Sequence, residues 1–436
     1  MRRISFLSVL VLLVAVSAGA QELKTGYFLD DYVYGYRLNP SATPSDSTRF
    51  FLGLLVGDMT LSTASNVGAS NIFFPIDGTL YNGLNSKVPA EQFIGGLPEV
   101  GKLDNVINLN ILTVGLKSKR GYFTFEANVK SNSFLSAPKG LFEFLKVGGN
   151  GVLYSMDDAE INTVNYVELA GGYSYQLNSR LKIGGAAKAL IGLGYANSNL
   201  SSFSAMIDDV NVVSSGSGGI VAALPGLSMP VGKDGNYDLN NAEFDKVKPS
   251  GFGAAIDLGV SWKATDNLTL SAAILDLGAV CWKTNVSGEL NSDKVSTPVY
   301  DSDTNKTLLG MFGFRPDGKK TLTKMLPATL NVGARYLMPF YDKLSAGILG
   351  SFRIGDSPMT DVRLGVTFSP SHVFSMALSG GATNYGAVFG GAFNLRLSVF
   401  DIFAGVDSFV FSITPQMLPV NKFNSTIKAG VTIAIQ

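Results

Sequence analysis

From residue 50 to the end of the chain, hydrophobic and polar residues alternate with a period of two. The segment 252–263 reads FGAAIDLGVSWK, so its even positions carry Phe, Ala, Ile, Leu, Val and Trp while its odd positions carry Gly, Ala, Asp, Ser and Lys. This period is typical of a β-strand with one apolar and one polar face. The segments 329–338, 343–354 and 427–435 repeat the pattern. The chain is therefore predicted to be all-β.

Fourteen segments follow this alternation, and most match the roughly 9 to 11 residues that a tilted strand needs to cross a membrane. They lie near residues 50–62, 106–117, 121–131, 163–177, 180–195, 251–264, 267–281, 328–338, 343–354, 360–369, 371–381, 385–398, 400–413 and 424–436. Only a closed sheet pairs all of its backbone groups inside hydrocarbon. We therefore predict a transmembrane antiparallel β-barrel of about 14 strands, with short helical elements in its loops.

The connections between these segments alternate in length. Those after even-numbered strands are short, at 118–120, 178–179, 265–266, 339–342, 370 and 399, whereas those after odd-numbered strands include 63–105, 132–162, 196–250 and 282–327. Outer-membrane barrels have short periplasmic turns and longer extracellular loops. A soluble sheet with one wet face has no reason to keep its long loops at one end. We expect both chain ends in the periplasm and the long loops outside.

The first 20 residues carry Arg2 and Arg3, an apolar run and then Ala18-Gly19-Ala20, which is typical of a secretory signal peptide. The chain is 46% hydrophobic and 16% charged, with zero formal net charge, and this balance does not suggest nucleic-acid binding. A single cysteine, Cys281, excludes an intramolecular disulfide. We predict a signal peptide at 1–20, an N-terminal periplasmic or plug segment at 21–49, and a transmembrane barrel at 50–436, located in the outer membrane of a Gram-negative cell.

Three segments outside the strands carry further expectations. The aromatic stretch before residue 50 could fold into the barrel as a plug, with Tyr27, Phe28, Leu29, Asp30, Asn39 and Pro40 as the candidate residues, or it could form an irregular periplasmic extension. Residues 138–147 are expected to form a short amphipathic helix that begins at Pro138 and ends before two glycines. The connection 196–250 is rich in Ser, Gly and Asn, which predicts a flexible surface loop with a small apolar patch.

Charged residues of both signs fall on the face of the strands that should line the lumen. The candidates are Glu126, Glu168, Lys188, Asp257, Arg335, Arg353, Arg363, Arg396, Asp407 and Lys428, with Lys130, Lys182, Lys263 and Asp361 on the same face. Such residues either surround water as a selectivity filter or pair with one another and fill the interior. The mixed signs favour pairing.

Little in the chain indicates catalysis. His372 is the only histidine and follows Pro370 at a predicted turn, so neither a histidine metal cluster nor a Ser-His catalytic site can be assembled convincingly. We expect no enzyme activity, no cofactor and no metal. Aromatic residues gather instead near the short turns, which is typical of the aromatic girdle of a barrel; they include Tyr122, Phe123, Tyr173, Tyr175, Tyr336, Phe340, Tyr341, Phe368, Phe374 and Phe400.

Three stretches carry a family resemblance, namely Tyr27-Phe28-Leu29-Asp30 with Leu38-Asn39-Pro40, the run from Ala137 to Lys146, and Leu275-Asp276-Leu277-Gly278 before Trp282. Together they resemble an uncharacterised outer-membrane β-barrel family of Bacteroidota, which is similar to the long-chain fatty-acid transporter barrels and to the shuttle barrel of type IX secretion. The resemblance implies fourteen strands and an N-terminal segment inside the barrel. Because the function of that family is unassigned, it implies no catalytic or ligand residues.

The first functional hypothesis is passive transport of a small hydrophobic compound, because apolar residues occur at 137–147 and 222–231 in loops that should face outside. Those loops would form an outer entrance and residues 21–49 a hatch. The alternative is a non-transport barrel, either a secretion-system adapter or a structural protein that presents its extracellular loops to a partner. A general diffusion porin comes third. The expected partners are outer-membrane lipid, a small hydrophobic ligand and a secretion-system or surface protein, but no nucleic acid.

Overall fold

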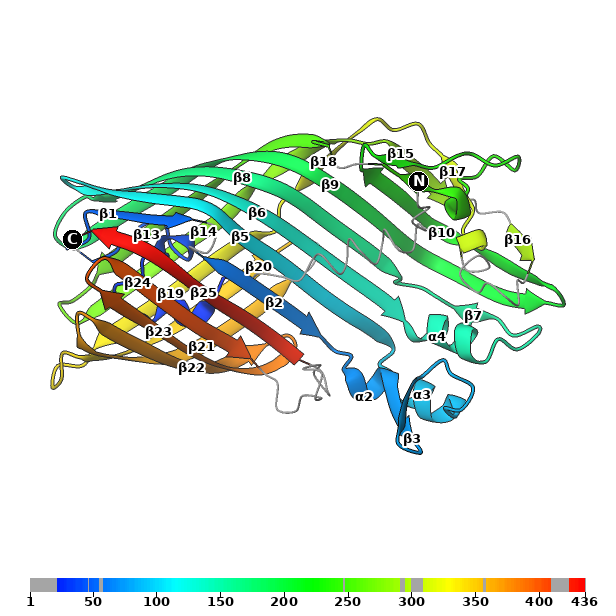
Figure 1. Cartoon of the computed structure of the whole chain (residues 1–436), viewed down its shortest axis with the longest axis horizontal. Coiled ribbons are helices and arrows are strands. Elements are labelled where there is room, and N and C mark those ends of the chain that lie inside the picture. The colour runs from blue at the N-terminus through cyan, green and yellow to red at the C-terminus, as the bar shows by residue number, and fades with distance from the viewer. Residues whose placement is uncertain are drawn as a thin grey trace.

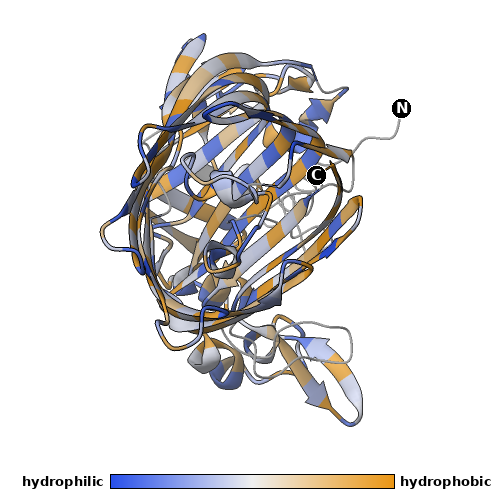
Figure 2. Cartoon of the chain, turned by 90° about the vertical axis from the view of Figure 1, so that its left-hand side faces the viewer, coloured by the Kyte–Doolittle hydropathy of each residue, from blue (hydrophilic) through white to orange (hydrophobic). Residues whose placement is uncertain are grey.

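The computed structural model describes residues 22–45, 47–54, 58–245, 248–290, 295–298, 309–355, 358–408 and 423–435. Over these residues the chain forms a closed antiparallel barrel of fourteen strands with a few short helices (Figure 1). The strands form a ring around an interior that contains irregular chain (Figure 2). The all-β barrel predicted from the sequence is confirmed.

The wall consists of β1 (Phe50–Leu54) with β2 (Met59–Ser65) as one interrupted strand, β5 (Val100–Ser118), β6 (Gly121–Pro138), β8 (Glu160–Gln176), β9 (Leu181–Asp208), β13 (Gly251–Lys263), β14 (Leu268–Lys283), β19 (Ala328–Leu337), β20 (Leu344–Ile354), β21 (Met359–Ser371), β22 (Phe374–Thr383), β23 (Gly386–Leu397), β24 (Phe400–Ser408) and β25 (Phe423–Ile435). These coincide in order and number with the fourteen predicted segments. The period-two pattern therefore located every wall strand.

The barrel closes between its first and last strands. One edge of β25 pairs with β24 from Phe400↔Ile433 to Ser408↔Ser425. Its other edge pairs with β1 near the short-turn end and with β2 over the whole length of that strand. Closure leaves no free edge on β25, as a strand inside hydrocarbon requires.

The two faces of the wall have opposite chemistry. Large apolar side chains on the outer face are exposed, for example Phe252 at 61%, Leu364 at 64% and Leu378 at 59%. Monomeric soluble proteins rarely expose contiguous apolar surface on this scale. The inner face instead buries charged and amide side chains, among them Lys428 and Asp58 at 0%. Among the described residues, no helix is long and apolar enough to cross a membrane.

Aromatic residues mark the short-turn end of the outer face. Phe123, Phe340 and Phe400 are exposed there at 52%, 80% and 48%. The assignment of Tyr122 to this girdle is wrong, because Tyr122 is only 4% exposed and its ring stacks on Phe51 inside the barrel at 5.8 Å. The alternation of faces already indicated this, because Tyr122 has the same parity along the strand as Glu126, which faces the interior.

The prediction of a flexible loop at 196–250 is wrong for most of its length. β9 continues unbroken to Asp208, turns, and pairs with β10 (Asn211–Ala223) in a long hairpin that rises above the barrel (Figure 1). The Ser- and Gly-rich composition hid this hairpin. Its apolar side chains are held by a buried cluster that includes Phe144, Phe203 and Phe314, so tertiary packing outweighs weak strand propensity.

The other elements lie beyond the wall at the long-loop end, apart from two short helices. They are α2 (Ala69–Ile72), β3 (Phe73–Ile76), β4 (Thr79–Asn82), α3 (Ala90–Gly96), α4 (Lys139–Lys146), β7 (Tyr154–Ser155), β11 (Leu227–Ser228), η3 (Leu239–Asn241), β12 (Glu243–Phe244), β15 (Val286–Leu290), β16 (Val295–Pro298), β17 (Phe314–Pro316) and β18 (Thr321–Met325). The predicted loop helix corresponds to α4, which begins after Pro138 and buries Phe144 against Tyr154 at 5.8 Å. The exceptions are η1 (Lys24–Tyr27) and η2 (Gly35–Arg37), which lie inside the barrel.

Candidate functional site: the barrel interior

Residues 22–45 lie inside the barrel at its short-turn end. Phe28, Val33 and Tyr34 are at most 1% exposed and pack with Leu29, Phe403 and their neighbours in one buried cluster. The wall makes room for this segment with glycine: a Cβ on Gly259 would lie 2.8 Å from the ring of Pro40. We refer to residues 22–45 as the inner segment.

The six residues singled out in the inner segment all contact the barrel wall or face its interior. Tyr27 hydrogen-bonds to Ser271 at 2.9 Å, the carbonyl of Phe28 accepts from Thr367, and Asp30 binds Arg335 and Ser369, each at 2.6 Å. Leu29 is 4% exposed, Asn39 donates to the carbonyl of Val260 at 3.0 Å, and Pro40 lines an internal cavity. The segment is therefore tied to strands on several sides of the ring.

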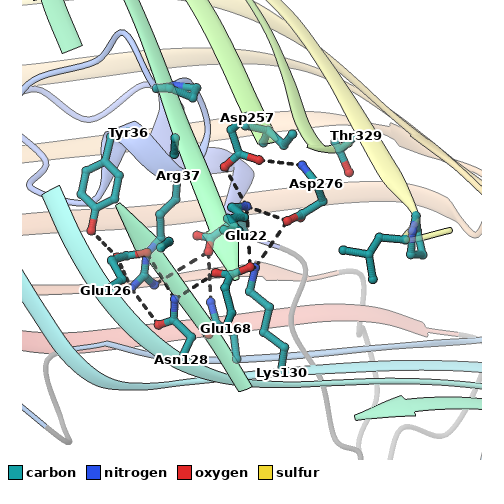
Figure 3. Close-up of a pocket in the computed structure, with 18 of the residues that line it drawn as sticks. Glu22, Tyr36, Arg37, Glu126, Asn128, Lys130, Glu168, Asp257, Asp276 and Thr329 are labelled. Carbon is teal, nitrogen blue, oxygen red and sulfur yellow. Dashed lines mark hydrogen bonds and ion pairs between the residues drawn. The ribbon is translucent and has the colours of Figure 1, made fainter. Parts of the chain in front are cut away.

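Arg37 connects the inner segment to the first and third strands of the wall (Figure 3). Its guanidinium donates to Glu126 on β6 at 2.7 and 2.8 Å and pairs with Asp58, which precedes β2. Lys428 of β25 pairs with Glu22 and lies 3.3 Å from Asp58. Burial alone would raise the pKa of the Glu22 carboxyl, but the Lys428 and Arg37 cations outweigh it and lower that pKa to about 2. Glu22 is thus ionised at neutral pH.

A second ionic cluster lies on the next strands of the ring, from β6 to β14. Lys188 of β9 contacts Asp257 at 2.7 Å and Asp276 at 2.6 Å, and Lys130 of β6 contacts Glu168 at 2.8 Å. The amide of Asn128 donates to Glu168 at 3.1 Å and to Glu126 at 3.2 Å, and so joins this cluster to the one around Arg37 (Figure 3). A continuous polar network therefore crosses the middle of the barrel.

Asp276 reaches this network through a β-bulge. Ile256 pairs with Leu277 and Leu258 pairs with Ile274, so two residues of β14 face Asp257 alone. Asp276 has a φ of 57°, and its amide donates to the Asp257 carboxylate at 2.7 Å. A bulge re-aims a side chain. Strict alternation would put Asp276 on the outer face, so the period-two pattern alone gives the wrong face for this residue.

All ten charged residues predicted to face the lumen have an ion-pair partner. Besides the pairs above, Arg335 binds Asp30, Arg353 binds Asp104, Arg363 binds Asp361 and Asp407 each at 2.6 Å, and Arg396 lies 3.3 Å from Asp401. Of the further four, Lys130 and Asp361 join these pairs, Lys182 contacts Thr43 at 3.0 Å, and Lys263 is exposed. The interior is a set of paired charges.

Several members of the network were missed from the sequence. Glu22 and Arg37 belong to a segment without strand periodicity, and Asp58 lies where the first strand is interrupted, so the alternation of faces gives no information about them. The one available signal was charge balance, because Lys428 and Glu126 needed buried counter-ions. The described residues contain no group of three His, Cys, Asp or Glu side chains arranged to hold a metal ion.

Above the inner segment the barrel keeps a cavity of about 140 Å³. Its floor includes Glu22, Lys24 and Arg37, and its wall includes Val106, Ile107 and Asn108 of β5. A smaller pocket of about 40 Å³ adjoins it toward the long-loop end, with a mostly apolar lining that includes Phe134, Val164, Val280, Trp282 and Leu326. The two spaces share several lining residues. The smaller pocket also contains Lys324 and the Asp104–Arg353 ion pair, so the lining becomes more apolar toward the long-loop end without losing its charges.

Substituting Lys188 by Met is expected to destabilise the barrel by about 3–5 kcal/mol, because Asp257 would remain buried without its cation. Urea unfolding in lipid vesicles, followed by tryptophan fluorescence, would measure the change. Lys319→Met is a matched control: Lys319 also pairs with two carboxylates, but its side chain is 62% exposed, and no measurable shift is expected. Equal unfolding midpoints for Lys188→Met and the wild type would contradict this role of the cluster.

One part of the wall lacks a ladder of hydrogen bonds. β1 pairs with β5 as far as Leu54↔Leu112, but no ladder joins β2 to β5 anywhere in the described chain. Two backbone bonds bracket the unpaired stretch, from the Asn110 amide to the Asp58 carbonyl at 3.1 Å and from the Asn66 amide to the Lys102 carbonyl at 3.3 Å. We call this stretch, residues 59–65 beside 103–109, the seam.

Unpartnered polar atoms gather along the seam. Asp58 Oδ1, Thr60 Oγ1, Asn108 Oδ1 and Asn110 Oδ1 are buried without a hydrogen-bond partner among the described residues. These side chains face the interior of the barrel, and a buried polar atom without a hydrogen-bond partner costs about 1–3 kcal/mol, so hydrogen bonds stabilise this part of the wall less. Val106, Ile107 and Asn108 also line the cavity. The seam therefore separates the cavity from the outside of the barrel.

A closed antiparallel barrel with an apolar outer face and an interior of paired charges defines a membrane-spanning β-barrel protein. Within that class, the chain belongs to the Family of unknown function (DUF5723), whose sequence profile matches residues 40–407. The prediction of an uncharacterised barrel family is confirmed, and an origin in Bacteroidota stays a prediction. A search of curated proteins finds no match.

Solved barrels of similar architecture include three bacterial proteins. The Ralstonia pickettii toluene transporter TbuX has a TM-score of 0.47 and 9% identity, over 97% of this chain and 98% of that one. The Pseudomonas putida toluene transporter TodX has a TM-score of 0.46 and 12% identity, over 96% of this chain and 98% of that one. A Pseudomonas aeruginosa FadL homologue has a TM-score of 0.46 and 11% identity, over 96% of this chain and 100% of that one. Similarity at this level carries no argument about what this chain binds or transports.

Proposed function

We propose that this chain is an outer-membrane barrel for passive transport of a small hydrophobic compound, and that the compound leaves the interior sideways through the seam. In this proposal the short turns and the inner segment are periplasmic, after removal of a signal peptide, and the long loops are extracellular. The observation that carries the proposal is the seam itself, an unpaired stretch of wall that borders directly on an internal cavity.

The short-turn end is a poor exit for any solute. Arg37, Asn39 and Asp30 tie the inner segment to separate strands through ion pairs and hydrogen bonds, and Lys24 and Thr25 are held by Asp407. Axial passage would require breaking these contacts together. In the proposal residues 22–45 are therefore a fixed plug, which is one of the two arrangements expected from the sequence, and not a hatch.

The long-loop half supports entry of an apolar compound. Its pocket is lined mainly by side chains such as Phe134, Val280 and Trp282, which favour apolar ligands. Below it, the ionic cavity disfavours apolar groups because its charges would lose their partners or their water. A hydrophobic compound at this boundary is thus driven toward the seam, where Leu61 and Leu109 border lipid at 37% and 41% exposure.

Uptake by reconstituted protein tests this function. Vesicles that contain the barrel should accumulate an apolar fluorescent probe, such as N-phenyl-1-naphthylamine, faster than protein-free vesicles, and mass spectrometry should find apolar molecules retained by the purified protein. A deletion strain should show the corresponding uptake defect. A reproducibly empty interior together with unchanged uptake would overturn the transport proposal.

A second candidate is a non-transport barrel that presents its extracellular loops to a secretion-system or surface protein. The packed layer beyond the barrel supports it, because the β9–β10 hairpin and α4 bury Phe144, Phe203 and Met311 in a common core. A rigid platform of this kind suits protein binding. Capture of one partner at constant stoichiometry in mild detergent, with no uptake of the apolar probe, would favour it over transport. No catalytic role is proposed, since His372 lies on an exposed turn.

A further inference from the structure

Basic residues gather at one side of the short-turn end. Lys117, Lys119, Arg120, Arg180, Lys182 and Lys263 all lie in or beside the turns that follow β5, β8 and β13. Two acidic residues occur nearby in the sequence, Asp266 in the third turn and Asp46, which lies outside the described residues. The whole chain carries 34 basic and 34 acidic residues, so this excess is local.

Four of these cations line a single groove of about 580 Å³, namely Lys117, Lys119, Arg120 and Lys182. The described part of its lining contains no acidic side chain; its other members are residues such as Thr43, Ser118, Gln176 and Asn178. Lys182 donates to Thr43 at 3.0 Å, and Arg120 donates to the hydroxyl of Tyr175 at 3.4 Å. The groove therefore offers several cations with hydrogen-bonding groups between them.

The groove lies at the edge of the lipid-facing surface. Phe123 is 52% exposed on the outer face, and its ring centroid lies 4.3 Å from that of Tyr173. Aromatic residues of this kind mark the level of the lipid headgroups. Leu177, which lines the groove, is itself 50% exposed. The cations thus stand where the phosphates of the nearer leaflet meet the barrel.

We propose that this groove binds the phosphate headgroup of an anionic phospholipid from the leaflet at the short-turn end. Arg120 can hold two phosphate oxygens at once, and the lysines supply point charges around them. The apolar surface of Phe123 and Leu177 beside the groove favours a lipid over a soluble phosphate, because acyl chains can cover it. The inference goes beyond transport and holds whichever way a solute leaves the barrel.

Lipid titration of the full-length protein in detergent tests the proposal, with native mass spectrometry as the readout. The wild type is expected to bind phosphatidylglycerol at least tenfold more tightly than phosphatidylcholine. Each cation near an anionic lipid surface contributes about fivefold, so Lys119→Gln with Arg120→Gln should weaken phosphatidylglycerol binding about 25-fold. The matched control is Lys319→Gln with Lys320→Gln, which removes the same charge from an exposed turn at the long-loop end and should leave binding unchanged.

Three outcomes would overturn the assignment: equal binding of the two lipids by the wild type, equal losses in the two double variants, or complete displacement of phosphatidylglycerol by millimolar inorganic phosphate. The heat-dependent mobility of the folded barrel on gels verifies that each variant has folded. A salt titration of the wild type needs no variant, and binding through these cations should weaken steadily as ionic strength rises.

Discussion

A disulfide between Ser62→Cys and Val106→Cys, made in a Cys281→Ser background, is expected to reduce uptake of an apolar probe at least tenfold. The two backbone bonds that bracket the seam share one register, and this register places residue 62 opposite residue 106 on the inner face. The covalent link would hold the two strands together where hydrogen bonds do not. Uptake of N-phenyl-1-naphthylamine into vesicles, before and after reduction with dithiothreitol, measures the effect.

The matched control is a disulfide between Ala377→Cys and Ala392→Cys. These residues are direct partners on β22 and β23, both are buried, and their strands are already joined by a continuous ladder. This link should leave uptake unchanged in either redox state. If the seam disulfide forms quantitatively and uptake persists, the compound does not leave through the seam, although transport by another route would still show in the unmodified protein.

Replacing Arg37 by Met is expected to loosen the inner segment and to open the barrel to small sugars. Glu126 would lose its only cation among the described residues, and Asp58 would keep only Lys428. Removing one partner of a buried ion pair costs about 3–5 kcal/mol. Each 1.4 kcal/mol changes an equilibrium constant tenfold. The equilibrium constant for docking of the inner segment would therefore fall by about two to four powers of ten. Liposome swelling in arabinose would measure the gain in permeability.

Arg353→Met provides the comparison for Arg37→Met. Arg353 is also a partly buried arginine of the interior, and it pairs with Asp104, which belongs to the wall strand β5 and not to the inner segment. Its loss should not increase swelling. Adding Glu126→Gln to Arg37→Met removes the Glu126 carboxylate that has lost its cation. The double variant should therefore be less permeable to sugars than Arg37→Met alone. Unchanged swelling for Arg37→Met would show that Arg37 does not hold the segment in place.

The wall of this barrel was predictable because successive residues of a membrane-spanning strand face lipid and the interior in turn, so that apolar and polar residues alternate in the sequence. Alternation such as that in 252–263 reports which side chains meet lipid, and all fourteen strands carried it. The same rule put Glu126 and Lys428 on the inner face, where they form ion pairs. Local period and turn length were therefore sufficient for strand number, order and direction.

The remaining features depend on contacts that no local pattern encodes. The bulge at Asp276 shifts the faces of β14 by one residue, and the β9–β10 hairpin is stabilised by side chains from distant loops. The seam is invisible in the sequence, because β2 shows ordinary alternation and lacks only its partner on one side. The hydrogen bonds between two strand edges depend on how all the strands of the wall are aligned with one another.

The ion pair between Glu22 and Lys428 joins residues that are 406 positions apart. Glu22 is thus synthesised 406 residues before its partner, which belongs to the last strand of the wall. The inner segment cannot complete its contacts until β25 has closed the ring against β1 and β2. Such long-range contacts form late because the loop between them must first be ordered. We therefore expect docking of the inner segment to be the final step of assembly, which closes the short-turn end only after the wall is complete.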